Sequence, residues 1–307
     1  MFDRKKVVCI LGATATGKSG LALELAKVLD GEIVSADSMQ IYQGFTIGTA
    51  KIRPDQMQGI PHHMLDILAP DATFSVAQYC TQASSVIDDL LSRCKVPLLV
   101  GGTGLYIDSL LSSLNFEDMA VDEEYRRRLT VCAQQQGNQA VWDMLNEVDP
   151  KLAQTLHPNN LRRVIRALEV YHISGKPMSE CAEKAQMESR FPAVYIGLRY
   201  ADRDKLYQRI DQRVDAMMEE GLLQEIEDLL ASGLSRDCQA LQAIGYKEFL
   251  PVLDGEMPVD VAVEAVKRNS RRYSKRQYTW FKRNHKIHWI NVDEEDVLAR
   301  AKEILGI

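Results

Sequence analysis

Short apolar segments alternate with amphipathic segments in the first third of the chain. Continuous apolar runs occur at Lys5–Gly12, at about Glu32–Ala36 and at Val96–Val100, and each is the length of a strand buried on both faces. Helical periodicity separates them at Lys18–Leu29 and Val76–Ser92. Strands that alternate with helices predict an α/β fold built on a doubly wound parallel sheet.

The pattern changes in the middle of the chain. From about Phe116 to Arg190 the sequence is charged and helix-forming, with no convincing strand. Strand-like sequence returns at Ala193–Tyr200. We therefore expect an α/β core made of residues 1–115 and 191–307, interrupted by an all-helical insertion domain at residues 116–190.

The C-terminal part continues the strand and helix alternation. A long amphipathic helix is predicted at Arg203–Leu230, with Gly233 as its stop. A last strand is predicted at Lys286–Val292, followed by a closing helix that ends near Leu305. Both ends of the chain thus contribute strands to one sheet.

Composition is that of an ordinary globular protein. The chain has 307 residues, 46% of them hydrophobic and 26% charged, and no stretch approaches about 20 uninterrupted apolar residues. Because no signal-peptide pattern opens the chain, we expect a cytoplasmic monomer without a membrane partner. Six dispersed cysteines without a C-x-x-C pair indicate neither zinc nor disulfides. Adjacent His62 and His63 lack a nearby third ligand, so we also reject a metal site there.

One segment departs from the overall acidic balance. The net charge is −6, yet Lys267–Arg283 contains eight Lys or Arg residues and no acid. At helical spacing its cations form a stripe that can neutralise RNA phosphates, formed by Arg268, Arg272, Lys275 and Arg276. A solvated charge run is the alternative, and we assign Trp280 and Phe281 at least in part to the core.

A second basic cluster lies in the predicted insertion. Arg162, Arg163 and Arg166 have helical spacing, so they can present one positive edge to the same anionic partner. A salt bridge to Glu169 is an equally good interpretation.

The strongest local motif follows the first predicted strand and opens the first predicted helix. Its sequence, GATATGKS, fits the phosphate-binding P-loop pattern and comprises Gly12, Ala13, Thr14, Ala15, Thr16, Gly17, Lys18 and Ser19. Glycines let backbone N–H groups turn toward phosphate oxygens, and Lys18 adds a full charge. Ser19 is the expected Mg²⁺ ligand. The motif predicts a P-loop NTPase-like sheet.

Polar residues follow two other predicted strands, at the sheet edge where ligands bind in such folds. Asp37, ionised at neutral pH, is a candidate proton acceptor, and a turn cap is its alternative role. Thr103 lies in the glycine-rich run VGGTGLY, which alone is weak evidence for a site. The apolar strand that ends at Val100 is not followed by the acid that a hydrolytic P-loop enzyme uses.

Taken together, these segments resemble the tRNA dimethylallyltransferase family, also called tRNA isopentenyltransferases. The resemblance covers nearly the whole chain in order. Its motifs are GATATGKS at Gly12–Ser19, ADSMQIY at Ala36–Tyr42, IGTAK at Ile47–Lys51, PHHMLD at Pro61–Asp66, VGGTGLY at Val100–Tyr106, RRVIRALEVY at Arg162–Tyr171, RVDAMMEEGL at Arg213–Leu222 and QAIGYKE at Gln242–Glu248. The absence of a zinc finger after Ile307 resembles the bacterial type.

The resemblance implies a reaction and a set of roles. A dimethylallyl group is transferred from dimethylallyl diphosphate to the exocyclic amine of the adenosine 3′ of the anticodon. Lys18, Arg213 and Mg²⁺ at Ser19 would stabilise the leaving diphosphate. Asp37 would be the general base, and Thr103 would position the reacting groups.

The resemblance also implies that the adenosine is flipped out of the anticodon loop to reach the donor. The base or its neighbours would touch family positions at Asp37, Ser38, Met39, Gln40, Thr103, Gln242, Ala243, Ile244, Gly245, Tyr246 and Lys247. The loop phosphates would be held by Arg162, Arg163, Arg166 and the stripe within Lys267–Arg283.

Three other functions remain open from the residues. An adenylate prenyltransferase has the same donor chemistry, but needs neither the basic segment nor the insertion. A P-loop nucleotide kinase is disfavoured by the missing acid after Val100. An RNA-binding protein that uses its P-loop only as a switch would bind RNA without turnover.

Overall fold

The computed structural model describes residues 2–112, 121–180 and 190–307. The chain divides into two compact units, one formed by residues 1–108 and 191–307 and the other by residues 109–190. The boundary of the second unit therefore falls in the helix that precedes the insertion, a few residues before the predicted position 116. In the described ranges, no helix combines the length and the apolar character that crossing a membrane requires.

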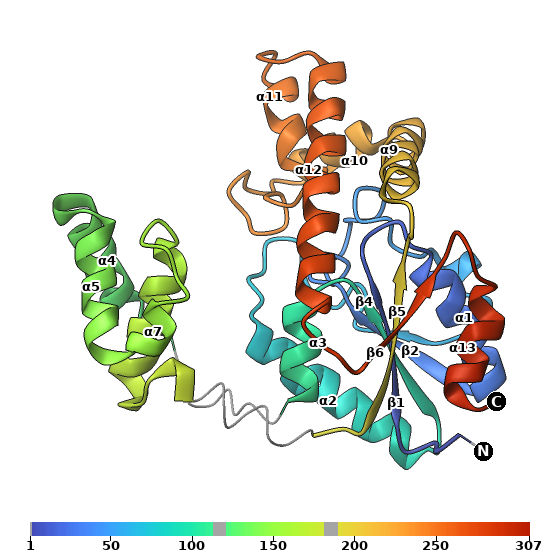
Figure 1. Ribbon diagram of the computed structural model, residues 1–307. Coiled ribbons are helices and arrows are strands. Elements are labelled where there is room, and N and C mark those ends of the chain that lie inside the picture. Colours follow the sequence, from blue (N-terminus) through green and yellow to red (C-terminus); the bar gives the residue numbers. More distant parts are fainter. Residues whose placement is uncertain (1, 113–120, 181–189) are drawn as a thin grey trace. The chain divides into compact units, whose positions relative to one another are not determined.

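The first unit is built on one six-stranded parallel sheet with strand order β3-β2-β4-β1-β5-β6 (Figure 1). The strands are β1 Val7–Gly12, β2 Gly31–Ala36, β3 His62–His63, β4 Val96–Gly101, β5 Ala193–Arg199 and β6 Ile287–Asn291. The predicted parallel sheet is confirmed, and five of its strands arise where the apolar pattern placed them. The short edge strand β3 was not predicted, since two histidines carry no apolar pattern.

Helices cover both faces of this sheet, as a doubly wound fold requires (Figure 1). On one face α1 (Lys18–Leu29) packs beside α13 (Val297–Leu305). On the other face lie α2 (Val76–Ser92), α3 (Gly104–Leu111) and α12 (Val259–Phe281). The core between α1, α13 and the sheet is aliphatic and includes fully buried Val8, Ile10, Leu25 and Ile290.

The strand register brings three chain segments to one edge. Ala36 at the end of β2 lies opposite Gly101 of β4, which in turn lies opposite Leu11 of β1. The strands approach closely there, because a Cβ on Gly101 would stand 2.1 Å from the Ala36 carbonyl oxygen. The segments that begin at Gly12, Asp37 and Thr103 therefore leave the sheet side by side, as predicted from strand direction.

The prediction of one continuous helix at Arg203–Leu230 is wrong, because the structure has two helices there. The structure has α9 at Arg203–Glu219 and α10 at Leu222–Ala231, separated at Gly221 with φ +94°. Glycine adopts this left-handed conformation without the steric cost that other residues meet, so the chain turns there. Further short helices are η1 (Pro54–Gln56), η3 (Lys247–Phe249) and α11 (Leu250–Leu253).

The second unit is helical over its described residues. It contains α4 (Glu123–Gln136), α5 (Asn138–Val148), α6 (Pro150–Ala153) and α7 (Leu161–Ser174) around its own apolar core. Glu169 is fully buried in α7 and accepts hydrogen bonds from Arg126 and Arg166. The salt-bridge interpretation of Arg166 is therefore correct, whereas Arg162 and Arg163 are exposed.

A charged network fastens β2 to its neighbours. The buried Glu32 carboxylate accepts two hydrogen bonds from Arg93, at 2.8 and 3.1 Å, and lies 2.7 Å from Nε2 of His63 on β3. The hydrogen bonds from Arg93, with help from His63 and against the effect of burial, lower the pKa of Glu32 to about 2. Through His63, this network ties the edge strand β3 to β2.

We expect Glu32→Gln to lower the free energy of unfolding at pH 7 by about 2 kcal/mol, because it removes the buried charge that accepts the hydrogen bonds of Arg93. A depressed carboxyl pKa stabilises the fold above the unfolded pKa near 4.5 and loses this effect as pH falls toward about 2. The difference in free energy of unfolding between wild type and Glu32→Gln, measured by urea unfolding, should therefore be smaller at pH 3 than at pH 7. Exposed Glu24→Gln is the control, and an unchanged deficit at pH 3 would contradict the assignment.

Candidate active site

Backbone geometry gives the P-loop its shape. Gly12 has φ +150°, and a Cβ there would stand 2.5 Å from the Leu198 carbonyl oxygen of β5. Gly17 has φ +84° at the start of α1, and Ala15 between them has φ +64°. The loop therefore wraps over the N-terminus of α1, where the first N–H groups have no partner within the helix. This is the geometry of an anion site.

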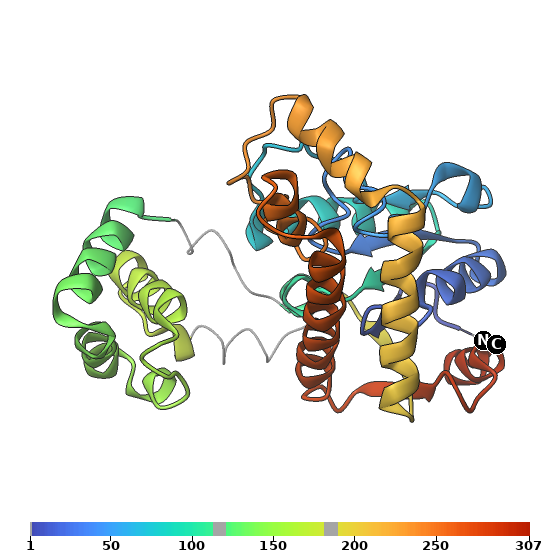
Figure 2. The ribbon, with the colours of Figure 1, turned by 90° about the horizontal axis from the view of Figure 1, so that it is seen from above.

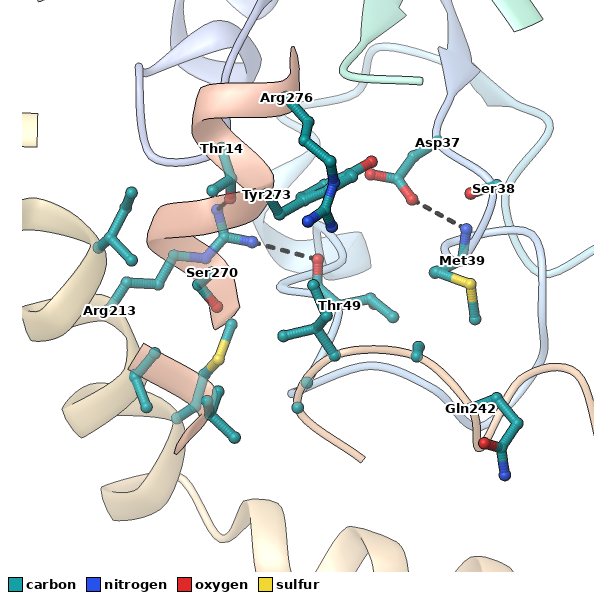
Figure 3. A pocket seen from close by; sticks show the side chains of 18 residues that line it. Thr14, Asp37, Ser38, Met39, Thr49, Arg213, Gln242, Ser270, Tyr273 and Arg276 are labelled. Carbon is teal, nitrogen blue, oxygen red and sulfur yellow. Dashed lines mark hydrogen bonds between the residues drawn. The ribbon is translucent and has the colours of Figure 1, made fainter. Parts of the chain in front are cut away.

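Two cations lie at this loop. Lys18 Nζ donates to the Ala13 carbonyl oxygen at 2.6 Å. Arg213, which comes from α9, donates to Thr14 Oγ1 at 2.8 Å and to the Thr49 carbonyl oxygen at 3.3 Å (Figure 3). Burial and the nearby Arg213 charge lower the pKa of Lys18 to about 7, although Asp37 opposes the shift. Burial also lowers the pKa of Arg213. An anion placed between them would relieve both effects.

Asp37 and Thr103 organise the neighbouring edge. Asp37 Oδ1 accepts the N–H of Met39 at 2.9 Å and that of Gln40 at 3.4 Å, so the turn-capping interpretation describes one of its oxygens. Thr103 Oγ1 accepts the N–H of Ser38 at 3.1 Å. These bonds hold the segment after β2 against the segment after β4.

Two adjoining pockets meet at this point. One, of about 230 Å³, is lined by the P-loop, including Lys18 and Ser19. The other, of about 290 Å³, is more apolar and open (Figure 3). Four residues line both pockets, namely Thr14, Asp37, Arg213 and Tyr273. A group that passes from a ligand in one pocket to a ligand in the other would cross here.

The second pocket gathers most of the residues expected around the acceptor base. Ser38, Met39, Gln242, Ala243, Ile244 and Gly245 line it, while Gln40 lines the P-loop pocket. Thr103, Tyr246 and Lys247 line neither of these two pockets. Tyr246 is fully buried under Gly48, and its hydroxyl donates to Glu225 at 2.7 Å. In this geometry Tyr246 supports the pocket wall from behind rather than facing the base.

A carboxylate missed by sequence reasoning shapes the same wall. Glu225 of α10 accepts the backbone N–H groups of Thr46, Ile47 and Gly48 at 3.1, 2.7 and 3.2 Å. No sequence pattern distinguishes it, because it follows a helix start at which acids are common.

The basic segment lies almost entirely on α12, and its cations have two different environments. Lys267 pairs with Asp215 at 2.7 Å and Arg271 with Asp211 at 2.5 Å, which joins α12 to α9 (Figure 2). The predicted stripe of Arg268, Arg272, Lys275 and Arg276 is exposed, and within the described ranges it forms no ion pair. Phe281 is core and Trp280 is half-buried, with Nε1 donating to Asp108 at 2.7 Å.

The inner face of α12 supplies two site residues that were not predicted. Tyr273 lines both pockets, and burial together with the Asp37 charge raises its pKa to about 12. Gln277 is buried one turn later and contacts the P-loop. The signal that could have found them is the helical stripe of uncharged residues opposite the cations, formed by Ser270, Tyr273, Ser274, Gln277 and Phe281.

A P-loop on a parallel sheet, with a second pocket that adjoins the P-loop pocket at Asp37, defines a P-loop α/β protein with two adjoining pockets. The family described as IPP transferase matches residues 40–284, and the one described as isopentenyl transferase matches residues 5–70. The chain belongs to the IPP transferase family. Curated proteins similar to it are named tRNA dimethylallyltransferase.

Individual relatives match over nearly the whole chain. The tRNA dimethylallyltransferase of Geobacillus thermodenitrificans is 49% identical, over 98% of this chain and 95% of its own. The crystal structure of the tRNA isopentenylpyrophosphate transferase from Bacillus halodurans has a TM-score of 0.74 at 44% identity, over 98% and 96% of the two chains. A eukaryotic dimethylallyltransferase acting on tRNA has a TM-score of 0.81 at 31% identity, over 98% and 78%.

We expect anion binding at the P-loop to take up a proton above pH 7. Lys18 is largely neutral there, and a bound phosphate favours its charged form. Calorimetry of inorganic diphosphate binding at pH 8, in two buffers that differ in ionisation enthalpy, should give an uptake greater by up to about one proton in the wild type than in Lys18→Arg. Arginine keeps its charge at this pH, so equal uptake by the two proteins would contradict the lowered pKa.

Proposed function

We propose that this protein transfers a dimethylallyl group from dimethylallyl diphosphate to the N6 amine of the adenosine 3′-adjacent to the anticodon in tRNA and releases diphosphate. The observation that carries the proposal is the junction of a phosphate pocket and a more open pocket at Thr14, Asp37, Arg213 and Tyr273, in a chain of the IPP transferase family. The open pocket, about 290 Å³, is suited to a flipped base.

The donor half of the reaction follows from the cations. As the allylic C–O bond breaks, negative charge grows on the diphosphate, and Lys18, Arg213 and the amides at the start of α1 stabilise it. Ser19 is exposed in the same pocket and, with phosphate oxygens and water, suits Mg²⁺, which seldom needs a full protein cage. When bound, Mg²⁺ would supply further neutralisation of the diphosphate.

The acceptor half follows from Asp37. The N6 nitrogen forms a bond to the allylic carbon while the bond to the diphosphate oxygen breaks, and the amine proton passes to the Asp37 carboxylate. Asp37 uses Oδ1 to accept the turn amides, which orients the carboxylate at the pocket junction. Thr103, bonded to the N–H of Ser38, holds the same segment in place.

The exposed stripe of α12 supports tRNA as the acceptor. Arg268, Arg272, Lys275 and Arg276 have no acid partner in the described part of the chain, so their charges are available to phosphates. Arg162 and Arg163 of the insertion are exposed candidates of the same kind, while Arg166 is committed to Glu169. We place the activity in the cytoplasm, where tRNA is found.

The decisive experiment offers labelled dimethylallyl diphosphate and Mg²⁺ with unmodified tRNA in one reaction and with AMP or ATP in another. We expect label at the adenosine beside the anticodon. Label in the free nucleotide would instead establish an adenylate prenyltransferase, and phosphoryl transfer from ATP without prenyl transfer would establish a kinase.

Asp37→Asn should lower kcat by about 10²- to 10⁴-fold, because the amide cannot take the amine proton. tRNA affinity should stay within about tenfold, since the phosphate contacts are elsewhere. The measurements are single-turnover transfer and filter binding, with exposed Asp71→Asn as the control. Near-normal turnover by Asp37→Asn would overturn the base assignment.

Reversing the charge of Arg268, Arg272 and Lys275 to Glu should weaken tRNA binding and flatten its dependence on salt. Each lost contact to a single-stranded phosphate removes about 0.7 from the slope of log K against log salt. The control reverses Lys27 and Arg300, on the helices of the opposite sheet face. An unchanged slope would move the RNA contact away from α12.

A further inference from the structure

Gln277 joins the two chain segments between which the transferred group must pass. Its Oε1 accepts the backbone N–H of Thr14 in the P-loop at 2.9 Å. Its Nε2 donates to the Gly102 carbonyl oxygen, after β4, at 3.0 Å. The side chain is 6% exposed, so neither bond competes with bulk water. A single amide thus links the P-loop to the segment that carries Thr103.

Two glycines of the run VGGTGLY, Gly102 and Gly104, leave room for side chains of α12. A Cβ on Gly102 would stand 2.2 Å from Gln277 Nε2, and a Cβ on Gly104 would stand 2.2 Å from the Trp280 ring. Both glycines therefore make room for side chains of α12. The glycine run, which alone was weak evidence for a site, has a specific packing partner.

Tyr273, one helical turn before Gln277, connects the Gln277 contact with Asp37, the proposed general base. The side chains of Thr103 and Gln277 are near enough to Tyr273 to oppose the rise in its pKa. In Figure 3 the phenol points toward the Asp37 carboxylate, at the junction of the two pockets. Because its pKa is raised to about 12, the phenol stays protonated and acts here as a hydrogen-bonding group.

Gln277 is a poor candidate for a phosphate ligand, because its side chain is already hydrogen-bonded to the protein. Gln277 Oε1 already accepts the backbone N–H of Thr14, so this N–H points toward α12. Diphosphate binding must then depend on Lys18, Arg213 and the amides that open α1. Loss of Gln277 should consequently disturb where the donor lies more than how tightly it binds.

We propose that Gln277 is a positioning residue that sets the distance between the donor cradle and the Asp37–Thr103 pair. The proposal rests on the proposed prenyl transfer. Near-attack placement requires the reacting atoms to be about 3 to 3.5 Å apart, and a misplacement of about 1 Å can cost about 100-fold in rate. A side-chain amide that is hydrogen-bonded to both sides of the junction can keep the reacting atoms within that distance.

The test compares Gln277→Met, which keeps the length of the side chain and removes both hydrogen bonds, with the wild type. Ser274→Ala is the matched control, because Ser274 is buried on the same helix and, among the described residues, its hydroxyl bonds only to the Arg271 carbonyl oxygen. We expect kcat for tRNA prenylation to fall about 10- to 100-fold in Gln277→Met and less than threefold in Ser274→Ala. Affinities for inorganic diphosphate and for tRNA should stay within about threefold in both.

Gly102→Ala provides a second route to the same contact. The new methyl group displaces the Gln277 amide, the flexible end of a side chain, while Gln277 itself remains. If both substitutions act through one contact, the double variant should be about as slow as the slower single variant. Should Gln277→Met fail to fold, Gly102→Ala alone carries the kcat and affinity comparison.

The outcomes separate the two proposals. A wild type that transfers no label to tRNA would refute the proposed function, whatever the variants do. A wild type that transfers label, with Gln277→Met or Gly102→Ala within threefold of its kcat, would overturn the positioning role. So would a loss of kcat that is matched by an equal loss of diphosphate affinity, since that would make Gln277 a part of the anion site.

Discussion

The close approach of α12 to the carboxyl ends of β1 and β4 is the contact on which the rest of the site depends. It is possible only because Gly102 and Gly104 lack side chains where Gln277 and Trp280 pack. Through it, one helix contacts the P-loop and the turn after β4, and its Tyr273 points toward Asp37 in the turn after β2 (Figure 3). The sheet alone brings these segments to one edge, and α12 fixes their spacing.

Electrostatics explain why such a rigid support is needed. Lys18 and Arg213 are two cations at one loop, and burial lowers the pKa of each. Keeping both side chains charged at one loop without an anion is unfavourable, so other contacts in the fold must hold them in place. The ion pairs of Asp211 and Asp215 with α12 fix α9 on either side of Arg213. An anionic donor then meets charges that need little rearrangement.

The basic segment shows how a single stretch of sequence can serve two purposes. On a helix, residues four apart share a face and the next residue along turns away from it, so Lys267 and Arg271 face the acids of α9 while Arg268 and Arg272 face outward. The paired cations hold α9, the helix that carries Arg213. The outward cations are available to RNA phosphates. Net charge over the segment does not distinguish these roles.

The sequence by itself determined the parallel sheet, the P-loop and the helical character of the described insertion, because strand and helix periodicity and glycine spacing are local properties of the chain. It also determined the family, since ordered motifs need no knowledge of contacts. The edge strand at His62–His63 and the burial of Tyr246 were missed, because each depends on residues distant in sequence. The turn at Gly221 was also missed, although it rests on the local conformation of a glycine. Only the tertiary structure decided that Tyr273 and Gln277 reach the site and that Glu225 shapes its wall. These are side chains with ordinary local patterns, and their roles come from what α10 and α12 are packed against.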